Sequence, residues 1–289
     1  MDTLLAPAAA LTAGALFGAN IHVQRSALGS TDPLVGAFYS VAAMAGLFWL
    51  ISPFFIKLDW FWSTPAIFFA IGGLVFPALG QSFQIFSIQR VGPALTAAIG
   101  SFVPFFAAVP AVLFLEESLG LQGTLAMTLM VGGLIFAAWP KEGVARSFPL
   151  WVLALPLGAA LARGIVQPVT SAGLSIGGNA VFATLLQSSV SALVLLCLLV
   201  ATGRGGQAVF AGPGKNRFLF SGLVNGLGIL CVNFALMHGE VTVVAPLIST
   251  TPIWAVGFGL LGIGPERPHL RHAVVAVMVF TGALLLLSR

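Results

Sequence analysis

Two apolar stretches, each interrupted by proline, decide the fold. The first covers residues 94–117 and reads ALTAAIGSFVPFFAAVPAVLFLEE, and the second covers residues 242–266 and reads TVVAPLISTTPIWAVGFGLLGIGPE. When Pro104 is aligned with Pro252, Ser101 meets Ser249, and one inserted residue later Glu117 meets Glu266. Interrupted apolar helices at corresponding positions of two halves are the sequence pattern of a transporter binding site.

The composition is that of a chain surrounded by lipid. Of its 289 residues, 58% are hydrophobic and only 7% are charged, whereas a soluble domain has about 25% charged residues. The 12 Lys and Arg residues are spread over the connections, so the basic balance indicates no nucleic-acid partner. Cys197 and Cys231 lie inside apolar runs, where we interpret them as small core residues and expect no disulfide or metal site.

The hydrophobic pattern predicts an all-α membrane protein. Segments of roughly 20 apolar residues can each span a bilayer, and the chain holds ten of them, at about 4–24, 33–56, 65–87, 93–115, 121–139, 149–170, 179–201, 217–237, 241–263 and 270–288. Five is an odd number, so two consecutive five-helix units must cross the membrane in opposite directions. We therefore expect two inverted repeats, 1–140 and 141–289, within one integral membrane domain.

The placement of Lys and Arg predicts the orientation in the membrane. Nine of these residues fall in the odd-numbered connections, Lys57 and Arg289 lie on the opposite side, and Arg163 lies within a span. Connections rich in Lys and Arg stay in the cytoplasm. This rule places both termini outside.

Pro104 and Pro252 are the predicted helix breaks. Proline lacks a backbone N–H and crowds the carbonyl four residues earlier, which would leave the Gly100 and Ile248 carbonyls without their usual partners. In a membrane such groups must be buried in protein or face a wet cavity. Each break is therefore either a cavity wall, with Ser101 and Ser249 facing a substrate, or a simple packing kink.

Arg163 is the cation that the pattern places deepest in a spanning segment. Aligning Gln24 with Gln167 places Asn20 opposite Arg163, and each pair is four residues apart on one helix face. A buried Arg is costly in lipid, so it must face the bundle interior or water. Either Arg163 binds a substrate carboxylate, oriented by Asn20 and Gln167, or it pairs with backbone carbonyls. His22 and Gln24 are expected at the membrane interface.

Further polar side chains lie within the predicted spans: Tyr39, Gln81, Gln84 and Asn225, with Trp254 two residues after Pro252. Buried amides often serve only to hold helices together. As a set they could instead line a polar cavity with aromatic walls, suited to a zwitterion with an apolar side chain.

All eight carboxylates lie near segment ends or in connections. A proton relay across a membrane usually needs an acid or a His at depth, so facilitated export fits better than proton antiport.

Glu116 and Glu117 precede the fifth segment, whose amides they are expected to cap. The Gly222-xxx-Gly226 spacing predicts a close helix contact.

The two halves together resemble the drug/metabolite transporter superfamily, in its ten-helix EamA-like branch. The resemblance rests on the proline-centred fourth and ninth segments, on Glu117 and Glu266, and on the Gly-rich fifth and tenth segments. The stretch at 237–242, MHGEVT, is similar to a turn in the aromatic amino-acid exporters of that superfamily. The resemblance implies an integral protein of a bacterial inner membrane. Family members are commonly drawn with cytoplasmic termini, opposite to the charge rule.

The leading hypothesis is a secondary transporter, exporting or facilitating the passage of amino acids or related small carboxylates by alternating access. The alternatives are a multidrug exporter of apolar cations, which Arg163 would repel, a membrane-embedded enzyme, and an accessory membrane protein. The sequence has no recognisable catalytic constellation or metal cluster, so we expect neither enzyme activity nor a cofactor. The expected partners are a small-molecule substrate and the bilayer, with the chain as a monomer or homodimer.

Overall fold

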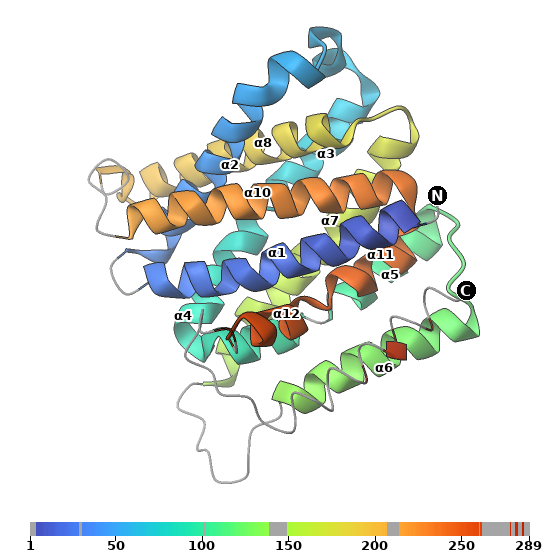
Figure 1. The fold of residues 1–289 in the computed structure, drawn as a ribbon. Coiled ribbons are helices and arrows are strands. Elements are labelled where there is room, and N and C mark those ends of the chain that lie inside the picture. Colours follow the sequence, from blue (N-terminus) through green and yellow to red (C-terminus); the bar gives the residue numbers. More distant parts are fainter. Residues whose placement is uncertain are drawn as a thin grey trace.

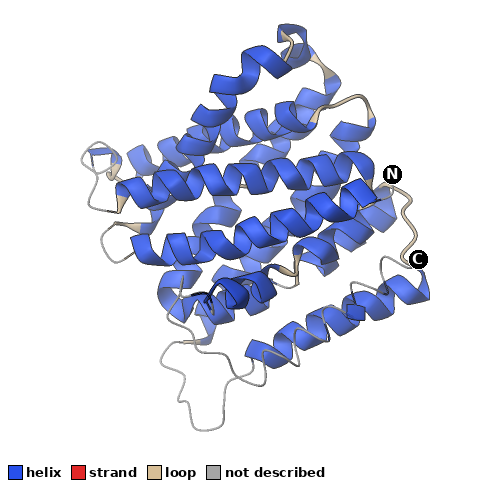
Figure 2. Cartoon of the chain, in the orientation of Figure 1, coloured by secondary structure: helices blue, strands red, loops and turns tan. Residues whose placement is uncertain are grey.

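The computed structural model describes residues 4–28, 31–100, 102–138, 149–206 and 214–259, together with 261, 278, 281–282 and 285. All regular secondary structure in these residues is helical (Figure 2). The elements are α1 (Leu5–Ala27), α2 (Pro33–Phe55), η2 (Leu58–Trp62), α3 (Thr64–Val75), α4 (Ala78–Gly100), α5 (Val103–Phe114), α6 (Gly120–Ala138), η3 (Leu150–Leu153), α7 (Ala154–Ser175), α8 (Ala180–Ala201), α10 (Lys215–His238), α11 (Val241–Ile248) and α12 (Thr251–Phe258).

Six helices of the described chain are long and apolar enough to cross a membrane. These stretches begin at Leu5, Pro33, Thr64, Leu150, Ala180 and Lys215, and the one from Thr64 to Val91 comprises α3 and the first part of α4. The all-α class is thus confirmed for the described residues. The predicted tenth segment, 270–288, lies almost entirely outside them.

Side chains of Asp and Asn cap the first turns of two helices. The Asp32 side chain accepts hydrogen bonds from the backbone N–H groups of Leu34 and Val35, and Pro33 is the first residue of α2. Asn179 caps α8 in the same way. These side chains satisfy N–H groups that have no partner within the helix.

The third predicted segment is divided in the structure. The sequence pattern suggested one helix over 65–87, but α3 ends at Val75 and α4 begins at Ala78. The Phe76 N–H still donates to the Gly72 carbonyl, at 2.8 Å, and Pro77 has no N–H to continue the series. The break places Phe76 beside the site described below.

The expected connection at Arg90–Pro93 is helical, since α4 runs through it to Gly100. The chain nevertheless bends there. The hydroxyls of Ser87 and Thr96 are 2.7 Å apart, whereas nine residues of a straight helix would separate them by roughly 13 Å. α4 therefore consists of two arms that meet at a sharp corner.

The helices pack in a regular set of neighbours. α1 contacts α10, α11 and α12, while α7 contacts α3, α4 and α5; α2 lies against α8 and α10, and α3 against α8. Figure 1 shows α1 and α10 running side by side, with α6 at the margin of the bundle. α6 contacts α4 and α11.

Glu117 caps a different helix from the one expected. Its carboxylate accepts hydrogen bonds from the backbone N–H groups of Val241 and Thr242, at 2.9 and 2.8 Å. These residues begin α11. The expectation that Glu117 caps the helix following it in sequence is wrong, because the loop folds back and its acid meets an N-terminus from the other half of the chain.

Candidate functional site

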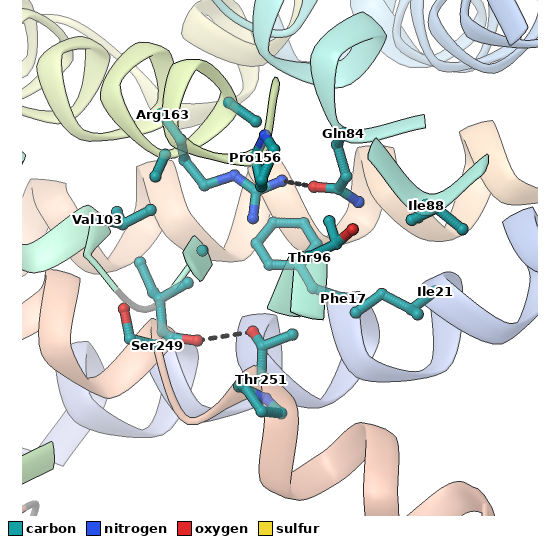
Figure 3. Close-up of a pocket in the computed structure, with 15 residues that line it drawn as sticks. Phe17, Ile21, Gln84, Ile88, Thr96, Val103, Pro156, Arg163, Ser249 and Thr251 are labelled. Atoms are coloured by element: carbon teal, nitrogen blue, oxygen red, sulfur yellow. Dashed lines mark hydrogen bonds between the residues drawn. The ribbon is translucent and has the colours of Figure 1, made fainter. Parts of the chain in front are cut away.

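A cavity lies where α1, α4 and α7 meet the break between α11 and α12. It offers about 50 Å³ to the centres of water-sized molecules, enough for a few waters. Figure 3 shows Arg163 and Gln84 on one side, Ser249 and Thr251 on the other, and the Phe17 ring between them. Its other walls are mainly apolar and include Ile21, Ile88, Val103, Pro156 and Ile248.

Arg163 projects from α7 into this cavity and has no acidic partner among the residues that the structure describes. Its Nη2 donates a short hydrogen bond to Gln84 Oε1 (Figure 3). Its guanidinium carbon lies 5.4 Å from the Phe17 ring centroid and 5.2 Å from that of Phe76. Ring faces attract cations, so the charge is held by an amide oxygen and two aromatic rings. The acidic residues of the described chain do not line the cavity.

The amides beside Arg163 form a directed chain. Arg can only donate hydrogen bonds, so the Gln84 oxygen must face it, and Gln84 Nε2 then donates to Gln24 Oε1 at 3.2 Å. Gln24 is fully buried, and its Nε2 is left without a partner. Gln24 is therefore buried between helices near the end of α1, and its expected depth at the membrane interface stays a prediction.

His22 is also buried. It is 8% exposed, and its Nε2 lies 2.7 Å from the Ala255 carbonyl oxygen of α12. α12 packs across the end of α1 and covers His22.

The structure confirms helix breaks at both predicted prolines. α4 ends at Gly100 and α5 begins at Val103, while α11 ends at Ile248 and α12 begins at Thr251. Pro104 and Pro252 are each the second residue of the new helix, a position whose N–H needs no partner. The Ile248 carbonyl is not orphaned, since Thr251 Oγ1 donates to it at 2.7 Å.

Of the two aligned serines, Ser249 lines the cavity and is buried, and its hydroxyl donates to the Ala245 carbonyl at 3.0 Å. Its remaining lone pairs can still accept a hydrogen bond from a ligand. Ser101 lies outside the described residues.

A second, smaller cavity lies on the other side of Arg163. It offers about 20 Å³ to water-sized centres and is bounded by α7, α8 and α10. Its polar wall is formed by Gln167, Thr170, Gln187 and Asn233. Phe17, Arg163 and Ile248 line both cavities and thus form the partition between them.

Other predicted site residues lie away from both cavities. Gln81 Nε2 donates to Ser40 Oγ at 3.0 Å, and Asn225 Nδ2 donates to Gln81 Oε1 at 2.9 Å. This network joins α2, α4 and α10. Gln81 and Gln84 are three residues apart, but Gln81 joins this network whereas Gln84 contacts Arg163.

Tyr39, Trp254 and Asn20 also do not line the two cavities. The Lys215 ammonium lies 5.6 Å from the Tyr39 ring centroid. The Trp254 indole donates to Thr250 Oγ1 at 3.2 Å, and the residue is 39% exposed. Asn20 is buried, one turn after Phe17 on α1, and its Oδ1 has no partner.

Comparison with known proteins gives the family. The model of the EamA-like transporter family matches residues 4–139 and again residues 150–288. The chain belongs to this family. The expected resemblance to the EamA-like branch is thereby confirmed, while the similarity of residues 237–242 to aromatic amino-acid exporters stays a prediction. The protein is an integral membrane transporter of small molecules.

At least one solved structure has the same fold over nearly the whole chain. Twenty-seven chains of solved structures match. One, a crystal structure of a protein, has 15% sequence identity to this chain and a TM-score of 0.71, and the match covers 97% of this chain and 95% of that one. That likeness shows the fold alone. No curated protein matches the chain.

Sequence reasoning missed two residues of this EamA-like site. Phe17 and Phe76 flank the Arg163 guanidinium, yet nothing in their spacing separates them from the other Phe residues among the 24 of the chain. Pro77 was the available signal for Phe76, because a proline within an apolar run predicts a helix end at the preceding residue.

Proposed function

We propose that the protein carries small carboxylate-bearing solutes, amino acids among them, with Arg163 as the carboxylate anchor. The observation that carries this proposal is a guanidinium that borders a cavity and whose partners within the described residues are the Gln84 amide and two rings. A carboxylate can pair with such a cation through two parallel hydrogen bonds. Ser249 and the apolar walls would receive the rest of the molecule.

Alternating access by two inverted repeats, 1–140 and 141–289, is the mechanism we propose. The family model matches each half separately. The packing also supports a repeat, because each half contacts the other in the same way. In this correspondence α1 matches α7, and the segment from α3 into α4 matches α10. The contact of α1 with α10 then corresponds to that of α7 with α3 and α4. Likewise α1 against α12 corresponds to α7 against α5.

Uptake into proteoliposomes tests the proposal. Purified wild type, Arg163→Gln and the control Arg90→Gln, which makes the same change at an exposed position, are given a panel of labelled amino acids, including aromatic ones. We expect carried amino acids to lose about tenfold or more of their uptake in Arg163→Gln, as for loss of a hydrogen-bonded charge pair, and no loss in Arg90→Gln.

The other outcomes contradict parts of the proposal. Equal uptake by wild type and Arg163→Gln would make Arg163 structural. Uptake of lipophilic cations, with no amino acid carried, would favour the multidrug alternative. Hydrolysis of a substrate without flux would favour an enzyme.

A further inference from the structure

Two residues that line the smaller cavity have a buried polar atom without a hydrogen-bond partner in the described chain: Arg163, at its donor Nε, and Gln167, at its acceptor Oε1. Gln167 follows Arg163 by one helical turn on α7 and is 2% exposed. Gln167 lines the cavity, and its Oε1 accepts no hydrogen bond from the described chain. A buried acceptor without a partner is unfavourable, so this oxygen marks a place for a donor from outside the protein.

The amide and hydroxyl groups that share the cavity with Gln167 already hydrogen-bond one another or the backbone. Gln187 Nε2 donates to Thr170 Oγ1 at 2.7 Å, and Asn233 Nδ2 donates to Thr184 Oγ1 and to Gln187 Oε1, at 2.9 and 3.2 Å. Thr170 Oγ1 itself donates to the Val166 carbonyl at 2.8 Å. These bonds brace α7, α8 and α10 around the cavity and leave Gln167 as the acceptor facing it.

The size of this cavity limits what can enter. Its 20 Å³ is room for about one group of the size of water, since a single water needs roughly 10–15 Å³. An amino group fits this space and a side chain does not. The larger cavity, on the other side of the Phe17–Arg163–Ile248 partition, has the volume and the apolar walls for a side chain.

The charge of Arg163 limits which amines could occupy the smaller cavity. A lone ammonium beside Arg163 would be repelled by the guanidinium, since like charges a few ångströms apart in a low dielectric are strongly unfavourable. A carboxylate on the same molecule, paired with Arg163, removes that repulsion. An α-amino acid carries both groups on one carbon atom and can reach across the partition.

We propose that the smaller cavity is the subsite for the amino group of the substrate, with Gln167 Oε1 as its acceptor. The inference rests on the proposed function, in which Arg163 binds the carboxylate. It narrows the substrate class from carboxylates in general to zwitterionic α-amino acids. It also makes Gln167 a residue that selects for the amino group.

The test compares an amino acid with its counterpart that lacks the amino group. Proteoliposomes of wild type, Gln167→Met and the control Gln89→Met take up L-leucine, or whichever amino acid the panel shows to be carried best, in competition with unlabelled 4-methylpentanoate or the corresponding des-amino acid. Methionine keeps the length of glutamine and removes its amide. Gln89 is exposed on α4, so the same change there leaves the cavities intact.

In wild type we expect the des-amino acid to compete about tenfold less well than the amino acid itself. In Gln167→Met the KM for the amino acid should rise about tenfold while competition by the des-amino acid stays within twofold of wild type. Gln89→Met should resemble wild type in both measurements.

Three results would overturn the inference. If the two ligands competed equally in wild type, the amino group would not contribute to binding and the amino subsite would be contradicted. The proposed transport of carboxylates would be unaffected by that result. An equal loss for both ligands in Gln167→Met would assign Gln167 a structural role. If no amino acid is carried at all, the proposed function fails and this inference fails with it.

Discussion

At the scale of single residues, Gln84 is the group of the protein that would compete with a substrate carboxylate for Arg163. Its oxygen is the acceptor for Arg163 in this structure. Replacing the amide by a carboxylate, Gln84→Glu, would put a permanent counter-ion on the guanidinium, and charged pairs are roughly twice as strong as neutral hydrogen bonds. We expect amino-acid uptake to fall about tenfold or more, with thermal stability in detergent retained.

Gln84→Leu is the matched comparison. It removes the acceptor without adding a charge, so Arg163 stays available, and we expect uptake to be reduced less than in Gln84→Glu while the melting temperature falls. If both variants carry amino acids as wild type does, Arg163 is not the carboxylate anchor.

The sequence alone reached part of this arrangement. Arg163 and Gln84 were predicted as site residues because they are polar side chains within spanning segments, and Ser249 because it lies beside the break at Pro252. The structure places all three on one cavity. Their mutual contacts lay beyond the pattern, since α1, α4 and α7 meet through folding and not through sequence spacing. The same limit hid the separation of Gln81 from Gln84.

At the scale of elements, the crossing of α2 and α10 depends on a missing side chain. A Cβ atom at Gly222 would lie 2.1 Å from the Ser40 backbone oxygen, so the helices would have to separate. We expect Gly222→Ala to destabilise the protein by about 1–3 kcal/mol, as overpacking does, and to lower its melting temperature in detergent.

Gly46→Ala provides the control on α2, because a Cβ there has nothing within 4 Å. Its melting temperature should stay close to that of wild type. A Gly222→Ala protein as stable as Gly46→Ala would show that the α2–α10 spacing can relax without cost.

Element boundaries were predictable where chemistry marks them and not elsewhere. The breaks near Pro104 and Pro252 follow from the missing N–H of proline, and both occur. The stretch at Arg90–Pro93 was predicted as a connection, but it lies within α4, which runs from Ala78 to Gly100. Glu117 caps α11, a pairing that joins residues more than a hundred positions apart and leaves no local signal.

At the scale of the whole molecule, basic side chains gather at one end of the bundle. Arg204 lies 3.6 Å from Asp32, and Arg217 donates to the Ser26 carbonyl at 2.5 Å. These contacts join the ends of α1 and α8 to the starts of α2 and α10. Lys57 lies beyond the opposite end of α2, on the other side of the membrane if α2 spans it.

The positive-inside rule therefore predicts that the end holding Arg204 and Arg217 faces the cytoplasm, against the orientation commonly drawn for the family. Single cysteines at Lys57→Cys and Gly206→Cys, both exposed positions, test this in a chain that also carries Cys197→Ser and Cys231→Ser. A membrane-impermeant maleimide should label Lys57→Cys on intact cells and Gly206→Cys only after permeabilisation. The reverse pattern would place both termini in the cytoplasm and would mean that the asymmetry of Lys and Arg does not set the orientation of this chain.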